Sequence, residues 1–426
     1  SVITIKTIEF LYLLGYIYEE EVVAMLIRQS YIDQIMPFVD MPLVKILTGV
    51  RRCGKSTIML LLMDELKKRG ISENRIVRFN FDTLEWQNAD VKQVFEIIKG
   101  KLVSNKRTYL FLDEIQEIEQ WERLVNTFME EGEYDVDIFV TGSNSKMMSS
   151  EISTYLTGRY VSFRVYPLSF VEYLEFRKEY AKLQDLSKEF LRYIEYGGFP
   201  AVHLKQLTPD EAYTIVKDIY NTTIFTDIVK RNQIRKVDQL ERIVKFAFDN
   251  VGNTFSANSI KSFLKSQSRS IDVETVYNYL AKLESAYILN RCSRQDLQGR
   301  EILKTQEKFY LADNAFKHAL LGYKQEDISQ TLENIVYLEL RRRGYDVYVG
   351  KLDTKEIDFV AEKQGKIIYV QVAYLLIDKK TQEREFGNLL QIEDNFPKYV
   401  VSMDEVDMSQ KGIIHLNIKD FLLNAW

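Results

Sequence analysis

The stretch Gly49-Val50-Arg51-Arg52-Cys53-Gly54-Lys55-Ser56 decides the fold of this chain. It follows a β-like apolar run that starts at Val44, and with Thr57 it opens a helical pattern. Glycines let a backbone wrap a phosphate chain, and successive N–H groups at a helix start supply positive potential. In such a loop the lysine reaches the β- and γ-phosphates and the serine hydroxyl ligates Mg²⁺. Residues 49–57 are therefore predicted to bind ATP or ADP with Mg²⁺.

A second element is needed for hydrolysis, and the run Thr108-Tyr109-Leu110-Phe111-Leu112-Asp113-Glu114 supplies it. A continuous apolar run of this length predicts a strand buried on both faces in a parallel sheet. Asp113 is predicted to hold Mg²⁺ through water, and Glu114 to polarise the attacking water. The alternative is a buried strand with a solvated acidic end, but the preceding phosphate loop favours catalysis.

Composition indicates a globular protein of several domains. The chain has 426 residues, of which 46% are hydrophobic, and only six are proline. No apolar stretch reaches the ~18–20 residues of a membrane span. The two cysteines, Cys53 and Cys292, lie far apart, which favours a reducing compartment and predicts a cytoplasmic protein.

Charge is distributed unevenly along the chain. The whole chain has 57 Lys and Arg against 62 Asp and Glu, whereas residues 229–310 have 15 against 9. A basic segment within an acidic protein is typical of a local nucleic-acid site, although a solvated helical surface gives the same excess. Residues 1–24 are either a leader or non-native extension before Met25, or a helix packed on the core; their charge layout does not fit an export signal.

Strand-like and helix-like runs alternate from Val44 to Leu168, which predicts five strands in a parallel three-layer α/β domain. The nucleotide is then expected at the carboxyl ends of the strands. Asn144, at the end of the fourth strand, is predicted to sense the γ-phosphate. Arg159, just before the fifth strand, is predicted to reach a γ-phosphate in cis or from a neighbouring subunit. Their alternatives are a capping Asn and a surface Arg.

Several strings in this order resemble one family. They are Ile46–Ser56, Leu112-Asp113-Glu114-Ile115-Gln116, Thr141-Gly142-Ser143-Asn144-Ser145, Leu156-Thr157-Gly158-Arg159, Tyr166-Pro167-Leu168-Ser169-Phe170 and Tyr196-Gly197-Gly198-Phe199-Pro200. The chain is similar to bacterial and archaeal AAA+-type ATPases with an uncharacterised C-terminal domain of the DUF4143 type, near the origin-recognition and STAND branches. The resemblance implies an ASCE-type sheet, in which one strand lies between the phosphate-loop strand and the acidic strand. We expect the ATPase domain over residues 25–190 and a helical lid over 191–230.

Residues 231–325 are predicted to form a winged helix-turn-helix. Apolar residues at 273, 276, 280 and 283 keep helical spacing, and a β-hairpin with a basic tip follows. The family resemblance implies the same domain. The residues expected to contact double-stranded DNA are Thr275, Asn278, Tyr279 and Lys282 in the major groove and Arg291, Arg294 and Arg300 on phosphates. A winged helix used only for protein contacts is the alternative.

Residues 326–426 resemble the core of PD-(D/E)xK nucleases, in which a helix Glu, a strand Asp and an acid-x-Lys strand gather Mg²⁺ and water. Glu333 and Asp358 match this pattern, whereas Gln371 replaces the second acid and Ala373 replaces the lysine. Alanine cannot stabilise charge on a scissile phosphate, so an inactive nuclease-like domain is predicted unless Lys366 or another lysine substitutes.

These features predict a Mg²⁺-dependent ATPase whose nucleotide state switches a winged-helix and nuclease-like tail that engages DNA. Two alternatives stay open: a STAND-like scaffold that is switched by ATP and ADP and recruits proteins, and an active nuclease driven by ATP. A homo-oligomer is expected if Arg159 acts in trans.

Overall fold

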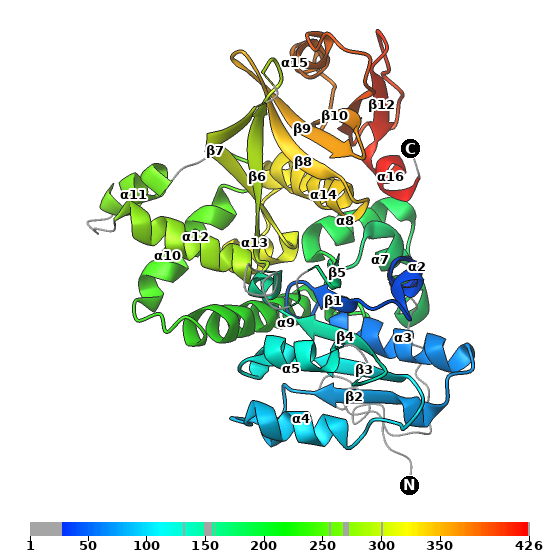
Figure 1. The fold of residues 1–426 in the computed structure, drawn as a ribbon. Coiled ribbons are helices and arrows are strands. Elements are labelled where there is room, and N and C mark those ends of the chain that lie inside the picture. Colours follow the sequence, from blue (N-terminus) through cyan, green and yellow to red (C-terminus); the bar gives the residue numbers. More distant parts are fainter. Residues whose placement is uncertain are drawn as a thin grey trace.

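The computed structural model describes residues 28–130, 133–148, 156, 158–254, 257–266, 272–299 and 301–424. The segment 1–24 and Arg300, for which predictions were made above, lie outside these residues. Figure 1 shows the chain as two β-sheets joined by a helical region. Within the described residues, no helix combines the length and the apolar character that crossing a membrane requires.

The first part of the chain alternates strands and helices. Its elements are α2 (Gln29–Ile35), η1 (Met36–Phe38), β1 (Val44–Thr48), α3 (Lys55–Lys68), η2 (Glu73–Arg75), β2 (Ile76–Asn80), η3 (Leu84–Trp86), α4 (Val91–Lys99), β3 (Thr108–Asp113), η4 (Ile115–Glu117), α5 (Trp121–Phe128), β4 (Val136–Gly142), η5 (Ser145–Met148) and β5 (Tyr160–Arg164).

The five strands form one parallel sheet in the order β2-β3-β4-β1-β5. The α/β fold with a parallel five-stranded sheet is therefore confirmed. β4 lies between the phosphate-loop strand β1 and the acidic strand β3, as the family resemblance implied.

Successive residues of these strands face opposite sides of the sheet, and both sides are apolar. Leu47, Phe111 and Phe139 pack in the cluster that contains Met59 of α3. Val44, Ile46, Leu110, Leu112, Ile138 and Val140 pack in the cluster that contains residues of α4 and α5. The sheet is therefore the middle of three layers, with α3 on one face and α4 and α5 on the other (Figure 1).

A helical region follows the first sheet. Its elements are α7 (Phe170–Tyr180), α8 (Leu186–Tyr196), η6 (Pro200–Val202), α9 (Pro209–Thr222), the π-helix η7 (Thr223–Lys230), α10 (Val237–Asp249), α11 (Ala257–Ser266) and α12 (Val273–Ser285). The predicted helix near residues 273–283 is present as α12, and Asp272 caps it by accepting from the backbone N–H of Thr275 at 2.8 Å.

The last part contains the second sheet. Its elements are β6 (Leu289–Asp296), β7 (Ile302–Leu311), α13 (Asn314–Leu321), η8 (Gln325–Asp327), α14 (Ile328–Arg342), β8 (Asp346–Leu352), β9 (Lys355–Lys363), β10 (Lys366–Val372), α15 (Lys379–Leu390), β11 (Lys398–Ser402), β12 (Ile414–Asn417) and α16 (Ile418–Leu423).

The strands of this sheet follow the order β12-β11-β10-β9-β8-β6-β7. The hairpin β6–β7 is present where the wing was predicted, and β6 also pairs in parallel with β8. Strand pairing thus joins the segment 231–325 to the segment 326–426 in one sheet. The sequence did not indicate this, because β6 and β8 are separated by about fifty residues and their pairing is a tertiary contact.

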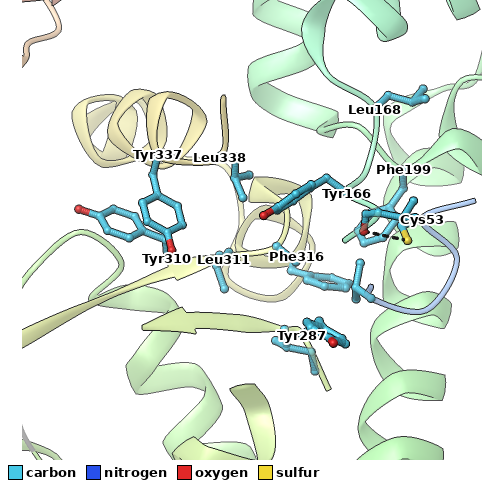
Figure 2. Packing of buried hydrophobic residues seen from close by; sticks show 14 of the residues in the cluster. Cys53, Tyr166, Leu168, Phe199, Tyr287, Tyr310, Leu311, Phe316, Tyr337 and Leu338 are labelled. Carbon is cyan, nitrogen blue, oxygen red and sulfur yellow. Dashed lines mark hydrogen bonds between the residues drawn. The ribbon is translucent and has the colours of Figure 1, made fainter. Parts of the chain in front are cut away.

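One continuous core links the phosphate loop to the second sheet. Figure 2 shows Cys53 of the loop and Tyr166 in the same cluster as Tyr287 and the stacked rings of Tyr310 and Tyr337. The ring centroids of Tyr310 and Tyr337 are 4.3 Å apart. Because this core is continuous, packed side chains connect the phosphate loop to the second sheet. A movement of the loop would therefore disturb that packing directly.

Candidate nucleotide-binding site

The phosphate loop connects β1 to α3, and its two glycines are needed for its shape. Gly49 has φ 154°, and a Cβ there would lie 2.1 Å from the backbone oxygen of Val165. Gly54 has φ 103° and is the N-cap of α3. A side chain at Gly49 would displace backbone, and Gly54 has a φ that residues with a Cβ rarely adopt. The loop therefore turns sharply and directs the first N–H groups of α3 toward its concave side.

Lys55, Ser56 and Asp113 lie together at the carboxyl ends of β1 and β3. The Lys55 ammonium donates to the backbone oxygens of Gly49 and Val50 at 3.1 and 3.3 Å. The Ser56 hydroxyl donates to Oδ1 of Asp113 at 3.0 Å, and Asp113 is buried. A hydroxyl beside a buried carboxylate is an oxygen-donor set that suits Mg²⁺. These residues thus fit the metal that a nucleotide brings.

Two further side chains hold Asp113, and sequence reasoning missed both. The Thr141 hydroxyl, on β4, donates to Oδ1 at 2.6 Å. Arg78, on β2, donates to Oδ2 at 2.6 Å and balances the buried charge. Thr141 could have been found from its place near the end of β4, three residues before Asn144. Arg78 gave no local signal, since its role depends on β2 pairing beside β3.

Glu114 follows the acidic strand in an unusual backbone conformation. Its φ is 51°, in the left-handed region, and its N–H donates to the Thr141 hydroxyl at 2.9 Å. Non-glycine residues held there often mark functional sites. A carboxylate oxygen lies 3.7 Å from the Lys55 ammonium. Burial alone would raise the pKa of Glu114, but Lys55 and Arg51 outweigh it and hold the pKa below its ordinary value.

The π-helix η7 and the residue that follows it contribute two side chains that sequence reasoning also missed. Arg51 of the loop forms two hydrogen bonds of 3.1 Å with Asp227, which is fully buried on η7. Ser143, at the end of β4, donates to the same carboxylate at 3.2 Å. Arg231 donates to Glu117 at 2.8 Å and so ties the end of η7 to the segment after β3. Such contacts, over a hundred residues apart in places, have no sequence signal.

Arg28 supports the loop from the other side, and it too was missed. Its guanidinium donates to the backbone oxygen of Cys53 at 2.9 Å and to that of Tyr166 at 2.9 Å. It also forms two 2.8 Å hydrogen bonds with Glu172. The pair of buried Arg28 and partly buried Glu172 thereby fixes the loop against α7.

Asn144 and Arg159 occupy different ends of the sheet. Asn144 is buried just beyond β4, whose Gly142 pairs with Thr48 next to the loop. Arg159 lies at the amino ends of β1 and β5, where its backbone oxygen accepts from Val44 at 2.9 Å. The length of β1, about 13 Å at ~3.3 Å per residue, separates it from the loop.

The prediction that Arg159 reaches a γ-phosphate in cis is therefore wrong. Its guanidinium instead donates to Asn126 at 2.8 Å. The arginine at the loop end of β5 is Arg164, which pairs in register with Thr48. Arg164 donates to Asn290 and packs against the rings of Tyr166 and Tyr287. Proximity to a strand in the sequence did not reveal which end of the strand the arginine occupies.

Four of the residues predicted to bind DNA lie in one groove, but not all four side chains are accessible. Thr275, Asn278, Tyr279 and Lys282 line one groove of about 530 Å³, which also includes Arg235 and Lys236. Tyr279 is itself mostly buried, and the Thr275 hydroxyl is bonded to Asp272.

Arg291 and Arg294 were predicted to contact DNA phosphates from the wing. In the structure, both instead lie close to acidic side chains of the chain itself. Arg291 forms ion pairs with Glu284 and Glu307, and Arg294 lies 3.8 Å from Glu356. Their charge is therefore largely compensated within the chain.

The residues of the nuclease-like pattern meet at one cavity of about 410 Å³. Glu333, Asp358 and Gln371 line it together with Glu356, Glu385 and Lys308. Lys308 is buried on β7, and its ammonium lies 3.0 Å from Glu333 and 2.8 Å from Glu356. Ala373 packs in an apolar cluster instead. The lysine that reaches this cavity is thus Lys308, whereas Lys366 is exposed at the start of β10.

Comparison with known proteins gives two family matches. The family described as an AAA domain matches residues 42–174, and a domain of unknown function, DUF8612, matches residues 187–327. A domain of unknown function thus follows the AAA domain, as the resemblance implied.

Relatives and one solved structure extend the comparison. An uncharacterized protein of Haemophilus influenzae is 36% identical over 403 residues, which are 94% of this chain and 99% of that protein. One of Methanocaldococcus jannaschii is 29% identical over 80% of this chain and 77% of its own length. A Walker-type ATPase of Pyrococcus abyssi has a TM-score of 0.48 at 13% identity, over 70% of this chain and 96% of that one.

Proposed function

We propose that this chain, which belongs to the same family as the Haemophilus influenzae protein and contains an AAA domain over residues 42–174, binds and hydrolyses ATP with Mg²⁺. The observation that carries the proposal is the Ser56–Asp113 contact of 3.0 Å beside the Lys55 ammonium and Glu114. Lys55 would bind the β- and γ-phosphates, and Glu114 would polarise the attacking water.

Mg²⁺ would be held by Ser56 directly and by Asp113 through water, and it would neutralise charge on the phosphates. The test is turnover of ATP by the full chain with Mg²⁺ and with the metal removed by EDTA. We expect phosphate release that depends on Mg²⁺. Absence of nucleotide binding by the folded chain would overturn the proposal.

Nucleotide state is proposed to reach the tail through two contacts. η5, which follows Asn144, contacts α12. Tyr287, after α12, packs against Arg164, which pairs in register with Thr48 at the base of the phosphate loop. Both contacts connect the nucleotide site to the groove beside α12, so a shift of the loop after β4 would move that helix.

We propose that this groove binds the phosphate backbone of DNA. Its basic residues are Arg235, Lys236 and Lys282, and its amides include Asn278. Replacing the three basic residues with alanine should weaken duplex binding about equally for all sequences. The slope of log affinity against log salt should fall by about 0.9 for each interaction with a phosphate that the replacements remove. Fluorescence anisotropy of labelled duplex over a salt series measures both.

The full chain is the right sample because β6 of the predicted winged helix pairs with β8. The matched control replaces Lys379 and Lys380, which are exposed on α15 away from the groove. If the groove variant and the control bind alike, DNA is not held there. If the wild type binds no duplex even at low salt, the STAND-like scaffold that recruits proteins becomes the better proposal, and the acidic partners of Arg291 and Arg294 favour it.

The nuclease-like domain is proposed to be inactive, with Lys308 as an internal counter-ion. Burial would lower the pKa of Lys308, yet Glu333, Asp358 and Glu356 raise it, so the lysine stays charged. Burial and Glu333 raise the pKa of Asp358, which favours its protonated form and weakens it as a metal ligand. Among the described residues, no group of three or more His, Cys, Asp or Glu is arranged to hold a metal ion.

We therefore expect no nicking of supercoiled DNA with Mg²⁺ or Mn²⁺, whether or not ATP is present. Gel analysis of plasmid forms measures this. Nicking by the wild type that survives Lys55→Ala but disappears in Asp358→Ala would instead support the active nuclease.

A further inference from the structure

The carboxylate of Asp227 lies among donors from three different parts of the nucleotide site. Both oxygens are 3.1 Å from Arg51 of the phosphate loop. The Ser143 hydroxyl donates to it at 3.2 Å from the end of β4, and a guanidinium nitrogen of Arg231 is 3.6 Å away. We call these four residues the Asp227 clasp. Since Asp227 is fully buried, the clasp ties η7 firmly to the loop.

The donors of the clasp are of the kind that bind a phosphate oxygen. Arginine guanidiniums and hydroxyls recognise phosphate through charge-assisted hydrogen bonds. They also lie close to the proposed reaction centre. Burial raises the pKa of Glu114, and Lys55, Arg51 and Arg231 together lower it below the ordinary value. Arg51 and Arg231 of the clasp are therefore close enough to influence Glu114, the carboxylate that would face the γ-phosphate.

The backbone that carries Asp227 is itself unusual. η7 is a π-helix of eight residues that continues α9. π-Helical segments are rare and are concentrated at functional sites. Residues 231–236 follow η7 and lead to α10, and Arg235 and Lys236 of this stretch line the basic groove. A movement of η7 would thus displace one wall of the groove.

We propose that Asp227 acts as an internal substitute for a phosphate oxygen, which the γ-phosphate of ATP displaces and ADP does not. This inference rests on the proposed ATP site. ATP then takes over Arg51 of the loop and so separates Asp227 and η7 from it, whereas ADP leaves the Asp227 clasp closed. Asp227 is accordingly a positioning residue that makes the lid respond to ATP specifically, and release of the lid alters the groove beside α12.

The test compares wild type, Asp227→Asn and, as a matched control, Asp218→Asn, an exposed position on α9. Calorimetry measures binding of ADP and of the non-hydrolysable β,γ-imido analogue of ATP to the full chain. Asp227→Asn removes the competing charge, so we expect affinity for the analogue to rise about tenfold and affinity for ADP to change less than about threefold. The control should match the wild type for both ligands.

Hydrogen exchange of residues 223–231 gives a readout that a purely structural role would not produce. In the wild type, exchange should rise with the analogue and stay low with ADP. In Asp227→Asn it should be high in all conditions. Arg51→Lys keeps a cation but loses the paired geometry, so it should show the same rise and serves if Asp227→Asn does not fold.

Two results separate failure of this inference from failure of the ATP site. A folded wild type that binds neither ligand overturns the proposed function. A wild type that binds both ligands with unchanged exchange at 223–231, or an Asp227→Asn variant that loses affinity for both equally, overturns the clasp alone.

Discussion

A Lys55→Ala variant is expected to bind ATP about 100-fold more weakly than the wild type, and to hydrolyse none at moderate ATP concentrations. Lys55 is buried, and its ammonium is held by Gly49, Val50 and Glu114 on the concave side of the loop. Removing one partner of a desolvated charge pair costs about 2–5 kcal/mol, because the other charge stays buried without compensation. Here that other charge is the triphosphate. Equilibrium binding of a fluorescent ATP analogue measures the loss.

The control is Lys68→Ala, an exposed lysine at the end of the same helix α3. It removes the same charge from the same element at a distance from the loop, and it should bind ATP as the wild type does. Thermal unfolding of both variants checks that Lys55→Ala still folds. Equal ATP affinity in the folded Lys55→Ala variant would show that the loop does not hold the phosphates.

The parts of the site that the sequence predicted correctly are those formed by neighbouring residues of the chain. Gly49 through Thr57 act through their own backbone, so one stretch of residues specifies the loop. Asp113 and Glu114 follow a strand that is apolar throughout, and this pattern places them at a carboxyl edge before any fold is known. In the structure Ser56 donates to Asp113 at 3.0 Å, and the Lys55 ammonium lies 3.7 Å from Glu114.

The residues that were missed or misplaced depend on packing between distant segments. Arg78 reaches Asp113 only because β2 pairs beside β3, and Asp227 reaches Arg51 only because η7 packs against the loop. Arg159 was predicted from its nearness to the fifth strand, but parallel pairing puts it at the amino edge.

The net charge of residues 229–310 also did not show which basic side chains are available to bind DNA. Counting arginines does not reveal that Glu284 and Glu307 neutralise Arg291. The lysine of the nuclease-like cavity came from β7, outside the segment in which the pattern was sought. In each case the sequence supplied the residue type, and tertiary contacts decided its role.

Replacement of Glu114 by glutamine is expected to separate binding from hydrolysis. Glutamine keeps the size of the side chain and can still bond to Gln116, so nucleotide affinity should stay close to that of the wild type. It cannot accept a proton from water, and loss of a general base lowers turnover by about 10²–10⁴-fold. Single-turnover release of phosphate at saturating ATP measures the step. Glu119→Gln, an exposed carboxylate five residues further, is the control and should retain full activity.

The pH dependence gives a second check on the same residue. Burial opposes ionisation of Glu114, but Lys55, Arg51 and Arg231 hold its pKa below the ordinary 4.5. A general base works only when ionised, so wild-type turnover should be lost on acidification only below that pH. An acidic limb with its midpoint well above 4.5, or undiminished turnover in Glu114→Gln, would assign the attacking water to a different base. The neighbouring cations thus explain how a largely buried carboxylate stays ionised, and so can accept a proton, at neutral pH.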